Sequence, residues 1–146
     1  MGHLLKMKRI LLPALLIGLL TACSDDDKKS SQALIGKWQP IKVNTYQGKD
    51  LVDSYDFEQD NNSCPDYAEF KSDGKMISID MDANCQHQED ILGVYTFDGS
   101  NLKVTIDGED ENYKMSSLTA TEFIIEDTYS DGGVTYKEVL NFKKIK

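Results

Sequence analysis

Two carboxylates lie where the sequence pattern calls for hydrophobic side chains. Asp127 and Glu138 share a face with apolar and aromatic residues of a predicted hairpin, which also carries Tyr129 and Tyr136. Carboxylates on an apolar face are costly unless they are paired, solvated or protonated. They could contact a cationic or hydroxyl-bearing ligand, or they could reach water where the strands twist. Paired carboxylates also hydrolyse glycosides, but no nucleophile or base motif accompanies these two, so we expect no catalytic residues and no enzyme activity.

The other reactive side chains are too few for a metal centre or a catalytic triad. Cys64, Cys85 and His87 are the only thiol and imidazole groups beyond residue 23, and a zinc site needs a further ligand. The acidic run 56–62 begins like an EF-hand loop but lacks its central glycine and closing glutamate. This run and the run 107–112 are therefore predicted to be solvated loops. We expect no metal and no cofactor.

The charge balance argues against a nucleic-acid partner. The chain has 146 residues, with 16 Lys and Arg against 25 Asp and Glu, and a net charge of -9. Nucleic-acid binding would need clustered Lys and Arg to neutralise phosphates. The length fits one domain, and an apolar fraction of 40% argues against disorder. Without residues 1–22, which we expect to be removed, 13 basic and 25 acidic residues remain, a net charge of -12, with one histidine.

Residues 1–22 have the pattern of a secretory signal peptide. Three basic residues within positions 6–9 precede an apolar stretch at 10–20. That stretch is too short for a membrane span, which needs about 20 residues, but it suits a cleaved leader. It ends in the letters LTAC at positions 20–23, which resemble the lipobox of bacterial lipoproteins. The resemblance implies that the leader is cut before Cys23 and that Cys23 becomes the lipidated N-terminus.

Lipidation would give the chain a membrane partner and an address. Each buried CH₂ of an acyl chain contributes roughly 0.8 kcal/mol, so several chains on Cys23 would hold the protein on a membrane. Residues 23–33 are polar and acidic and are predicted to form a flexible tether. Ser24 resembles an outer-membrane sorting signal, and the acidic run after it resembles the surface-export signal of lipoproteins from Bacteroidota. We expect an outer-membrane lipoprotein that faces the periplasm or the cell surface.

Cys64 and Cys85 are predicted to form a disulfide. They are an even pair in a chain exported to an oxidising compartment, where disulfides persist. Between them, an Asp-Gly pair at 73–74 is a strong signal for a two-residue hairpin turn. A turn centred there pairs Phe70 with Ile77 and brings both cysteines to the open end of the hairpin. Closing this loop of about 22 residues would stabilise the fold by about 3 kcal/mol in the chain-entropy model.

The chain beyond the tether alternates hydrophobic and polar residues in short segments separated by turns, which is typical of β-strands. We expect eight strands, at Leu34–Thr45, Asp66–Lys71, Lys75–Met81, Leu92–Phe97, Leu102–Asp107, Tyr113–Leu118, Glu122–Tyr129 and Val134–Ile145. The segment 47–63 is predicted to be a long loop. Its Tyr55 and Phe57 would anchor a protein partner or cover one end of the domain. Eight such strands favour an all-β, antiparallel up-and-down barrel.

Turn positions also predict which side chains share the interior face. The expected cross-strand pairs are Phe97 with Leu102, Tyr95 with Val104, Ile106 with Tyr113, and Val104 with Met115. In the last hairpin, the shared face carries Phe123, Ile125, Tyr129, Tyr136, Leu140 and Phe142. A one-residue slip would turn each set outward, so agreement among several hairpins supports a single apolar interior.

The first predicted strand carries Gly36 two residues before Trp38. Glycine admits close approach of a backbone, and tryptophan can close the floor of a barrel and donate its N–H to a carbonyl. This spacing looks like the Gly-x-Trp signature of lipocalins and related calycins. Together with the lipobox, it resembles the lipocalin-like domain lipoproteins of Bacteroidota over residues 34–146. Lys143 and Lys144 stand where many lipocalins place an arginine against the tryptophan, and a Thr-Asp-Tyr motif is absent.

Two functions from different classes remain open. In the first, the barrel binds a small, partly apolar ligand, with the two carboxylates and the two tyrosines of the last hairpin as contacts. In the second, aromatic side chains fill the barrel, and the lipoprotein has a non-catalytic structural or protein-interaction role through the segment 47–63. A cavity would favour the first function, and a filled barrel with exposed apolar residues in that segment would favour the second.

Overall fold

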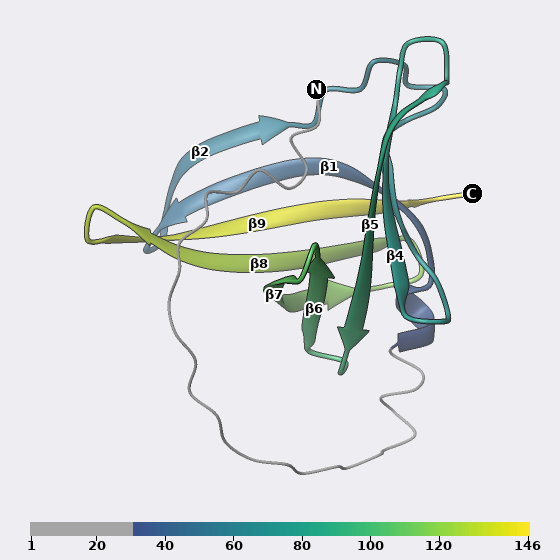
Figure 1. Cartoon of the computed structure of the whole chain (residues 1–146). Helices are drawn as coiled ribbons and strands as arrows, with labels where there is room; N and C mark the ends of the chain where they lie inside the picture. Colours follow the sequence, from purple (N-terminus) through teal and green to yellow (C-terminus); the bar gives the residue numbers. More distant parts are fainter. Residues whose placement is uncertain (1–30) are drawn as a thin grey trace.

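The computed structural model describes residues 31–146, which form an all-β domain (Figure 1). Its strands are β1 (Gly36–Gln47), β2 (Asp50–Asp56), β3 (Tyr67–Phe70), β4 (Lys75–Met81), β5 (His87–Phe97), β6 (Asn101–Ile106), β7 (Glu109–Leu118), β8 (Glu122–Asp131) and β9 (Val134–Ile145). Within the described part, no helix has the length and apolar character needed to cross a membrane. The predicted signal peptide, Cys23 and the tether up to residue 30 lie outside the described residues.

Eight of these strands close into the predicted antiparallel barrel. Strands β3 to β9 pair in sequence order, and β1 pairs with both β3 and β9. The β1–β9 ladder runs from Lys37 opposite Ile145 to Gln47 opposite Tyr136. Figure 1 shows β1, β9 and β8 side by side as long strands, with the β4–β5 pair crossing them. The register of β1 shifts between Pro40 and Lys42, because proline lacks the N–H that a regular ladder needs.

The segment 47–63 is not a continuous loop as predicted. Its residues Asp50–Asp56 form β2, a ninth strand that pairs only with the second half of β1. Gly48, with a φ of 62°, lies in the turn that reverses the chain. All seven β2 residues are exposed, and three of them are aspartates, which are depleted in strands. The strand is therefore held by its backbone ladder rather than by burial, which explains why the side-chain pattern did not reveal it.

The floor of the barrel is built on Trp38, which is completely buried. Its Nε1 donates a hydrogen bond of 2.7 Å to the carbonyl of Leu34, which lies in a helical turn at 31–34 rather than in the first strand as predicted. The ring packs edge-on against Phe123, with centroids 4.9 Å apart. The Nζ of Lys144 lies 4.9 Å from the Trp38 ring centroid and donates a hydrogen bond to the carbonyl of Ile35. Lys144 thus occupies the position of the arginine expected in many lipocalins.

Two hairpins differ from the predicted register. Phe70 pairs with Met76 rather than with Ile77, because a three-residue turn closed by Gly74 at a φ of 83° replaces the two-residue turn. This one-residue difference places Met76 and Ser78 on the interior face. In the β6–β7 hairpin, the residues Asp107 and Gly108 make a tighter turn than expected, so strand β7 begins at Glu109.

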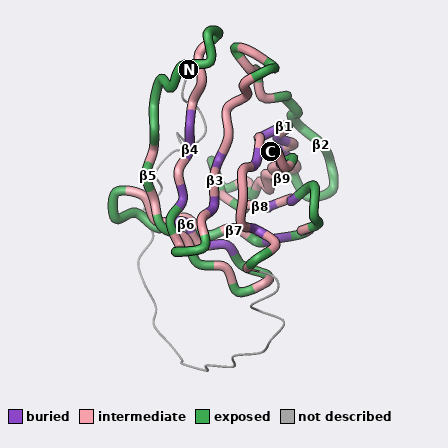
Figure 2. The backbone as a smooth tube through the Cα atoms, turned by 90° about the vertical axis from the view of Figure 1, so that its right-hand side faces the viewer, coloured by how far each residue is buried: buried purple, intermediate pink, exposed green. Residues whose placement is uncertain are grey.

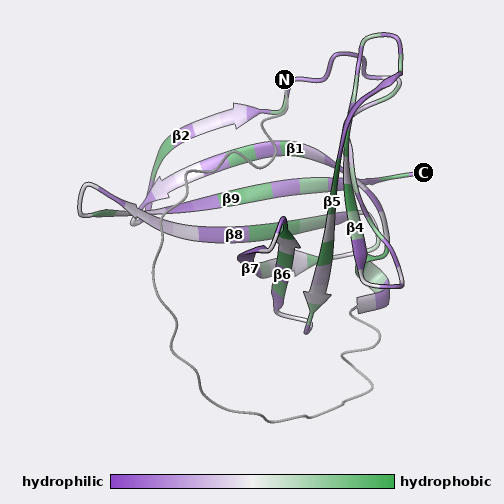
Figure 3. Ribbon diagram, viewed as in Figure 1, coloured by the Kyte–Doolittle hydropathy of each residue, from purple (hydrophilic) through white to green (hydrophobic). Residues whose placement is uncertain are grey.

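The β5–β6 hairpin has the predicted pairs, with Phe97 opposite Leu102 and Tyr95 opposite Val104. The predicted disulfide between Cys64 and Cys85 is present, with the two Cα atoms 5.6 Å apart. Strand β2 and the first half of β5 are exposed, whereas β1, β3 and β4 each carry buried residues (Figure 2). Along β8, the hydrophobic residues 123–125 are followed by hydrophilic residues toward the turn that joins β8 to β9 (Figure 3).

Candidate ligand site at the barrel mouth

A small pocket lies inside the barrel between strands β3, β4 and β6–β9. Its lining is mostly apolar and includes Phe70, Leu102, Val104, Phe123, Ile125 and Leu140. About 50 Å³ of it is open to the centres of water-sized molecules. This space is enough for several waters or for one small organic group. The barrel interior is thus largely filled, with a restricted space left open.

Glu111 and Tyr113 bring polar atoms to this apolar pocket. Both lie in its lining, and the Tyr113 hydroxyl donates a hydrogen bond of 2.6 Å to Oε2 of Glu111. Burial raises the pKa of Tyr113 far above its ordinary value, and the Glu111 carboxylate raises it further. Tyr113 therefore remains a neutral hydrogen-bond donor at physiological pH. Ser78 is the third polar side chain in the lining.

The sequence prediction missed Glu111 as an interior residue. It was placed in a turn, with Val104 opposite Met115 and Ile106 opposite Tyr113. In the structure Val104 pairs with Glu111, and Leu102 pairs with Tyr113. The tighter turn shifts the register by an even number of residues, so Tyr113 still faces inward. The Asp-Gly pair at 107–108 is a two-residue turn signal, and centring the hairpin on it would have placed Glu111 inside.

The predicted contacts of the last hairpin lie just beyond the pocket rather than in its lining. Asp127 and Glu138 are directly opposite each other, as are Tyr129 and Tyr136, whose rings stack with centroids 5.5 Å apart. Ile125 and Leu140 line the pocket, and the two carboxylates follow two residues further along the same strands. Since residues two apart share a strand face, Asp127 and Glu138 lie at the mouth of the pocket on its inner face.

These carboxylates belong to a row that crosses four strands. Thr45 of β1 pairs with Glu138 of β9 on one side and with Asp53 of β2 on the other. Residues opposite each other in a ladder point to the same face. Asp53, Glu138 and Asp127 therefore lie on one face with the buried Thr45 between the first two. We call these three carboxylates, together with Glu111, the mouth carboxylates.

Burial raises the pKa of Glu138 above its ordinary value. A hydrogen bond from the Tyr129 hydroxyl acts in the opposite direction, and the charges of Asp127 and Asp53 raise the pKa further. Tyr55 on β2 also has a raised pKa, first through burial and then through the charges of Glu138 and Asp53. The carboxylates of this row therefore act electrostatically on Glu138 and on Tyr55.

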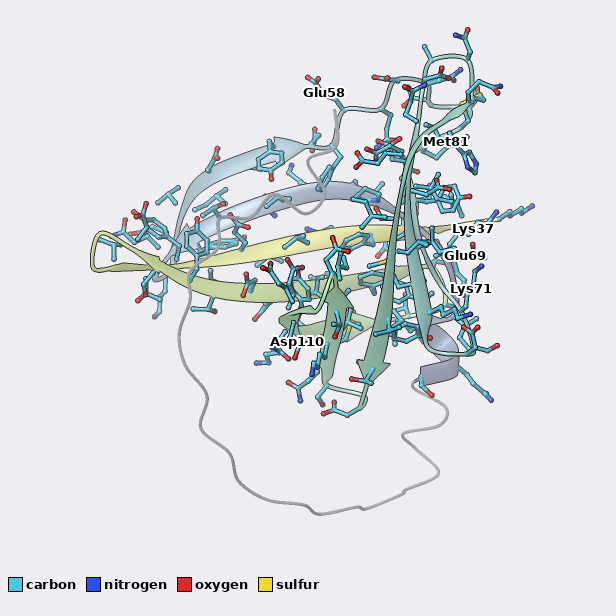
Figure 4. The ribbon with its side chains drawn as sticks, viewed as in Figure 1. Lys37, Glu58, Glu69, Lys71, Met81 and Asp110 are labelled. Carbon is cyan, nitrogen blue, oxygen red and sulfur yellow. A yellow bond between two sulfur atoms is a disulfide. The ribbon has the colours of Figure 1, made fainter. Side chains whose placement is uncertain are left out.

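The mouth carboxylates lack the lysine partner that each of two outward-facing acids, Asp110 of β7 and Glu126 of β8, has. Among residues 31–146, the ion pairs include Lys137 with Glu126 at 3.9 Å and Lys103 with Asp110 at 2.7 Å, but none that involves a mouth carboxylate. Figure 4 labels Asp110 beside the β6–β7 hairpin. In the same described range, no three His, Cys, Asp or Glu side chains are grouped closely enough to hold a metal ion. In the part of the chain that the structure describes, none of the mouth carboxylates thus forms an ion pair with a basic group.

Replacing Glu138 by glutamine is expected to stabilise the fold at neutral pH. A carboxyl group whose folded-state pKa is raised contributes stability below its unfolded-state pKa and loses that contribution as the pH rises through the folded-state pKa. At pH 7 the neutral glutamine avoids this loss, and we expect a gain on the order of 0.5 kcal/mol because water screens the partly exposed charge. Urea unfolding of wild type and Glu138→Gln between pH 4 and pH 7 measures the difference, which should shrink toward pH 4.

The control for this prediction is Glu126→Gln, which removes a charge from the outer face of β8. Glu126 lies 3.9 Å from the Lys137 ammonium, so its removal should give no gain at pH 7. A Glu138→Gln variant that is less stable than wild type at pH 7, or whose gain grows toward pH 4, contradicts the prediction.

Comparison with known proteins identifies the family of this barrel. Residues 34–125 match the family model of a lipocalin-like domain, and no curated protein matches the sequence. Among solved structures, lobster apocrustacyanin A1 is similar with a TM-score of 0.51 and 12% identity, over 84% of this chain and 70% of that one. Apocrustacyanin C1 gives a TM-score of 0.50 with the same identity and coverage. These likenesses agree with the barrel topology, and the chain belongs to the lipocalin-like domain family.

Proposed function

We propose that this protein is a lipid-anchored outer-membrane lipoprotein whose barrel binds a small, partly apolar ligand. The observation that carries the binding role is the pocket, in which apolar side chains surround the polar groups of Ser78, Glu111 and Tyr113. A concave apolar site with a few converging polar groups is the usual form of a small-molecule site. The restricted space favours a ligand whose buried part is no larger than a small ring or a short alkyl chain.

The lipid anchor is supported by the leader and by the cysteines. The letters LTAC at 20–23 end an apolar stretch of signal-peptide length. Cys64 and Cys85 form a disulfide, which fits an exported, oxidising location. Cys23 is therefore left as the residue for lipid attachment, and the acidic residues after it would separate the barrel from the membrane surface.

Replacing Cys23 by alanine is expected to abolish lipid attachment and to shift the protein from the membrane fraction to the soluble or unprocessed fraction. Acyl chains supply the membrane affinity in this proposal, and alanine offers no thiol for them. Labelling of cells with radioactive palmitate, followed by fractionation, measures the change. A Ser24→Ala variant is the control and should remain labelled. Palmitate labelling that persists in Cys23→Ala contradicts the proposed anchor.

Filling the pocket is expected to remove the ligand while preserving the fold. Ala68 is buried and lines the pocket, so Ala68→Leu would place three additional carbon atoms in the space that the ligand needs. Native mass spectrometry of the purified protein should detect a co-purifying small molecule in wild type and at least about ten-fold less of it in the variant. Ala83→Leu, at an exposed position, is the matched control and should retain the ligand. Equal ligand occupancy in wild type and Ala68→Leu contradicts binding in this pocket.

Two observations favour the alternative role in protein interaction: the barrel interior is largely filled, and β2 exposes apolar side chains. Strand β2 is fully exposed, and its Leu51, Val52 and Tyr55 side chains are each about half accessible to solvent. An exposed strand edge with apolar side chains can pair with another chain. Absence of any bound small molecule from wild type, together with a protein that is cross-linked through β2, would favour this second role.

A further inference from the structure

We propose that the ligand is a small organic cation, an amine with a short apolar part, whose charged end lies among the mouth carboxylates and whose apolar end enters the pocket. The inference rests on the proposed function, because it assigns a chemical class to the ligand of the same barrel. Three observations support it. The pocket continues into the mouth, the mouth carboxylates have no ion-pair partner among residues 31–146, and they are too far apart to hold one metal ion together.

The pocket and the mouth are parts of one surface. Ile125 and Leu140 line the pocket, and Asp127 and Glu138 lie two residues further along the same strand faces. At about 3.3 Å of rise per residue, this step is about 7 Å. Glu111 is itself in the pocket lining. A molecule with a charged group one or two bonds from a ring or a short alkyl chain would therefore reach apolar side chains and carboxylates together.

The inner face of the barrel mouth lacks the charge that would balance it. Asp127 and Glu138 are directly opposite each other across β8 and β9, an arrangement that destabilises a sheet when both groups are ionised. The outer acids Glu126 and Asp110 each have a lysine partner, whereas the mouth carboxylates have none within residues 31–146. A bound cation would relieve the repulsion between Asp127 and Glu138, and a bound anion would add to it.

The spacing of the carboxylates fits an organic cation better than a metal ion. Asp53 and Asp127 lie three strand spacings apart along the row that contains Glu138. At about 4.8 Å per spacing, the row extends over about 14 Å. Calcium ligands lie about 2.3–2.6 Å from the ion, so one ion cannot contact the whole row. An ammonium group with attached carbon atoms can lie between carboxylates and contact the faces of Tyr129 and Tyr136, which attract cations.

Three probes of similar size and different charge test the inference. Isothermal titration calorimetry at pH 7 would compare benzylamine, benzyl alcohol and benzoate on the purified protein. We expect benzylamine to bind about ten-fold more tightly than benzyl alcohol, and benzoate to bind most weakly. In the double variant Asp127→Asn/Glu138→Gln, the preference for benzylamine should fall to about three-fold or less. The control variant Asp110→Asn, which removes an outer charge, should keep the full preference.

The outcomes separate this inference from the proposed function. Equal affinities for benzylamine and benzyl alcohol, with both lost in Ala68→Leu, would overturn the cationic class while supporting a small-ligand pocket. Absence of binding by all three probes would overturn the inference and count against the pocket as a ligand site. Calcium chloride that binds with one-to-one stoichiometry and displaces benzylamine would replace the organic cation by a metal ion, and would also overturn the inference. Retention of the full preference in the double variant would exclude Asp127 and Glu138 as its source and would overturn the inference.

Discussion

Replacing Trp38 by alanine is expected to destabilise the barrel by about 4 kcal/mol, within the range for removal of a large buried aromatic side chain. Trp38 is completely buried, so the substitution leaves a cavity on the barrel floor. It also removes the edge-on contact with Phe123 and leaves the Leu34 carbonyl without its indole donor. The Lys144 ammonium, 4.9 Å from the ring centroid, loses a favourable cation–π contact.

The conservative variant Trp38→Phe separates these contributions. Phenylalanine retains most of the buried ring but cannot donate to Leu34, so we expect a loss of about 1–2 kcal/mol. Urea unfolding must be followed by circular dichroism, because Trp38 is the single tryptophan of the chain and both variants lack its fluorescence. A loss below about 1.5 kcal/mol for Trp38→Ala would show that neighbouring side chains collapse into the space, and would contradict a rigid floor.

The hydrophobic pattern predicted the barrel because alternation is a property of each strand by itself. The pairs of the β5–β6 hairpin and the shared interior face of Phe123, Ile125, Leu140 and Phe142 follow from period two and from turn position. Strand β2 escaped prediction because none of its residues is buried. Its seven residues are held as a strand by backbone hydrogen bonds to β1. Such bonds do not require an alternating pattern of hydrophobic and polar side chains.

Part of the candidate site was also predictable from the alternation of hydrophobic and polar residues along single strands. Asp127 and Glu138 were identified because they interrupt a regular apolar face, and the structure brings them opposite each other. Glu111 was missed because its position depends on the length of one turn. The turn after Ile106 is four residues shorter than predicted, which moves Glu111 from a loop to the interior. Asp53 was missed with β2, since only its pairing with Thr45 places it in the same row as Glu138.

The volume of the pocket cannot be predicted from the alternation of hydrophobic and polar residues. Alternation shows which side chains point inward, but the remaining space depends on how rings pack against one another. Phe123 stacks on Phe142 at 4.3 Å between centroids, and Phe70 contacts Tyr95 edge-on at 4.9 Å. These contacts fill most of the interior and leave the open space near Glu111 and Tyr113. A barrel with the same pattern and a different packing of these rings could be closed or wide open.

Removal of the disulfide by the double substitution Cys64→Ser/Cys85→Ser is expected to lower the free energy of unfolding by about 3 kcal/mol. The bridge joins residues 21 apart in sequence, and Cys85 is exposed. Because little apolar surface is lost, the main effect comes from the larger conformational entropy of the unfolded chain. In the folded state, the hydrogen bonds from Met81 N to Asp66 and from Asn61 to the Ala83 carbonyl still connect the two bridged segments.

Urea unfolding of the double variant and of reduced wild type should give the same loss, since both lack the bridge. Cys64→Ser and Cys85→Ser alone should each match the double variant, because one missing sulfur already prevents the bond. A reductant keeps the remaining thiol from pairing with another molecule. The pocket lining includes neither cysteine, so benzylamine affinity of the folded double variant should stay within about two-fold of wild type. A loss of stability below about 1 kcal/mol would mean that the unfolded chain keeps these segments together without the bridge. A large loss of affinity would instead mean that the disulfide end of the β4–β5 pair controls the shape of the barrel mouth.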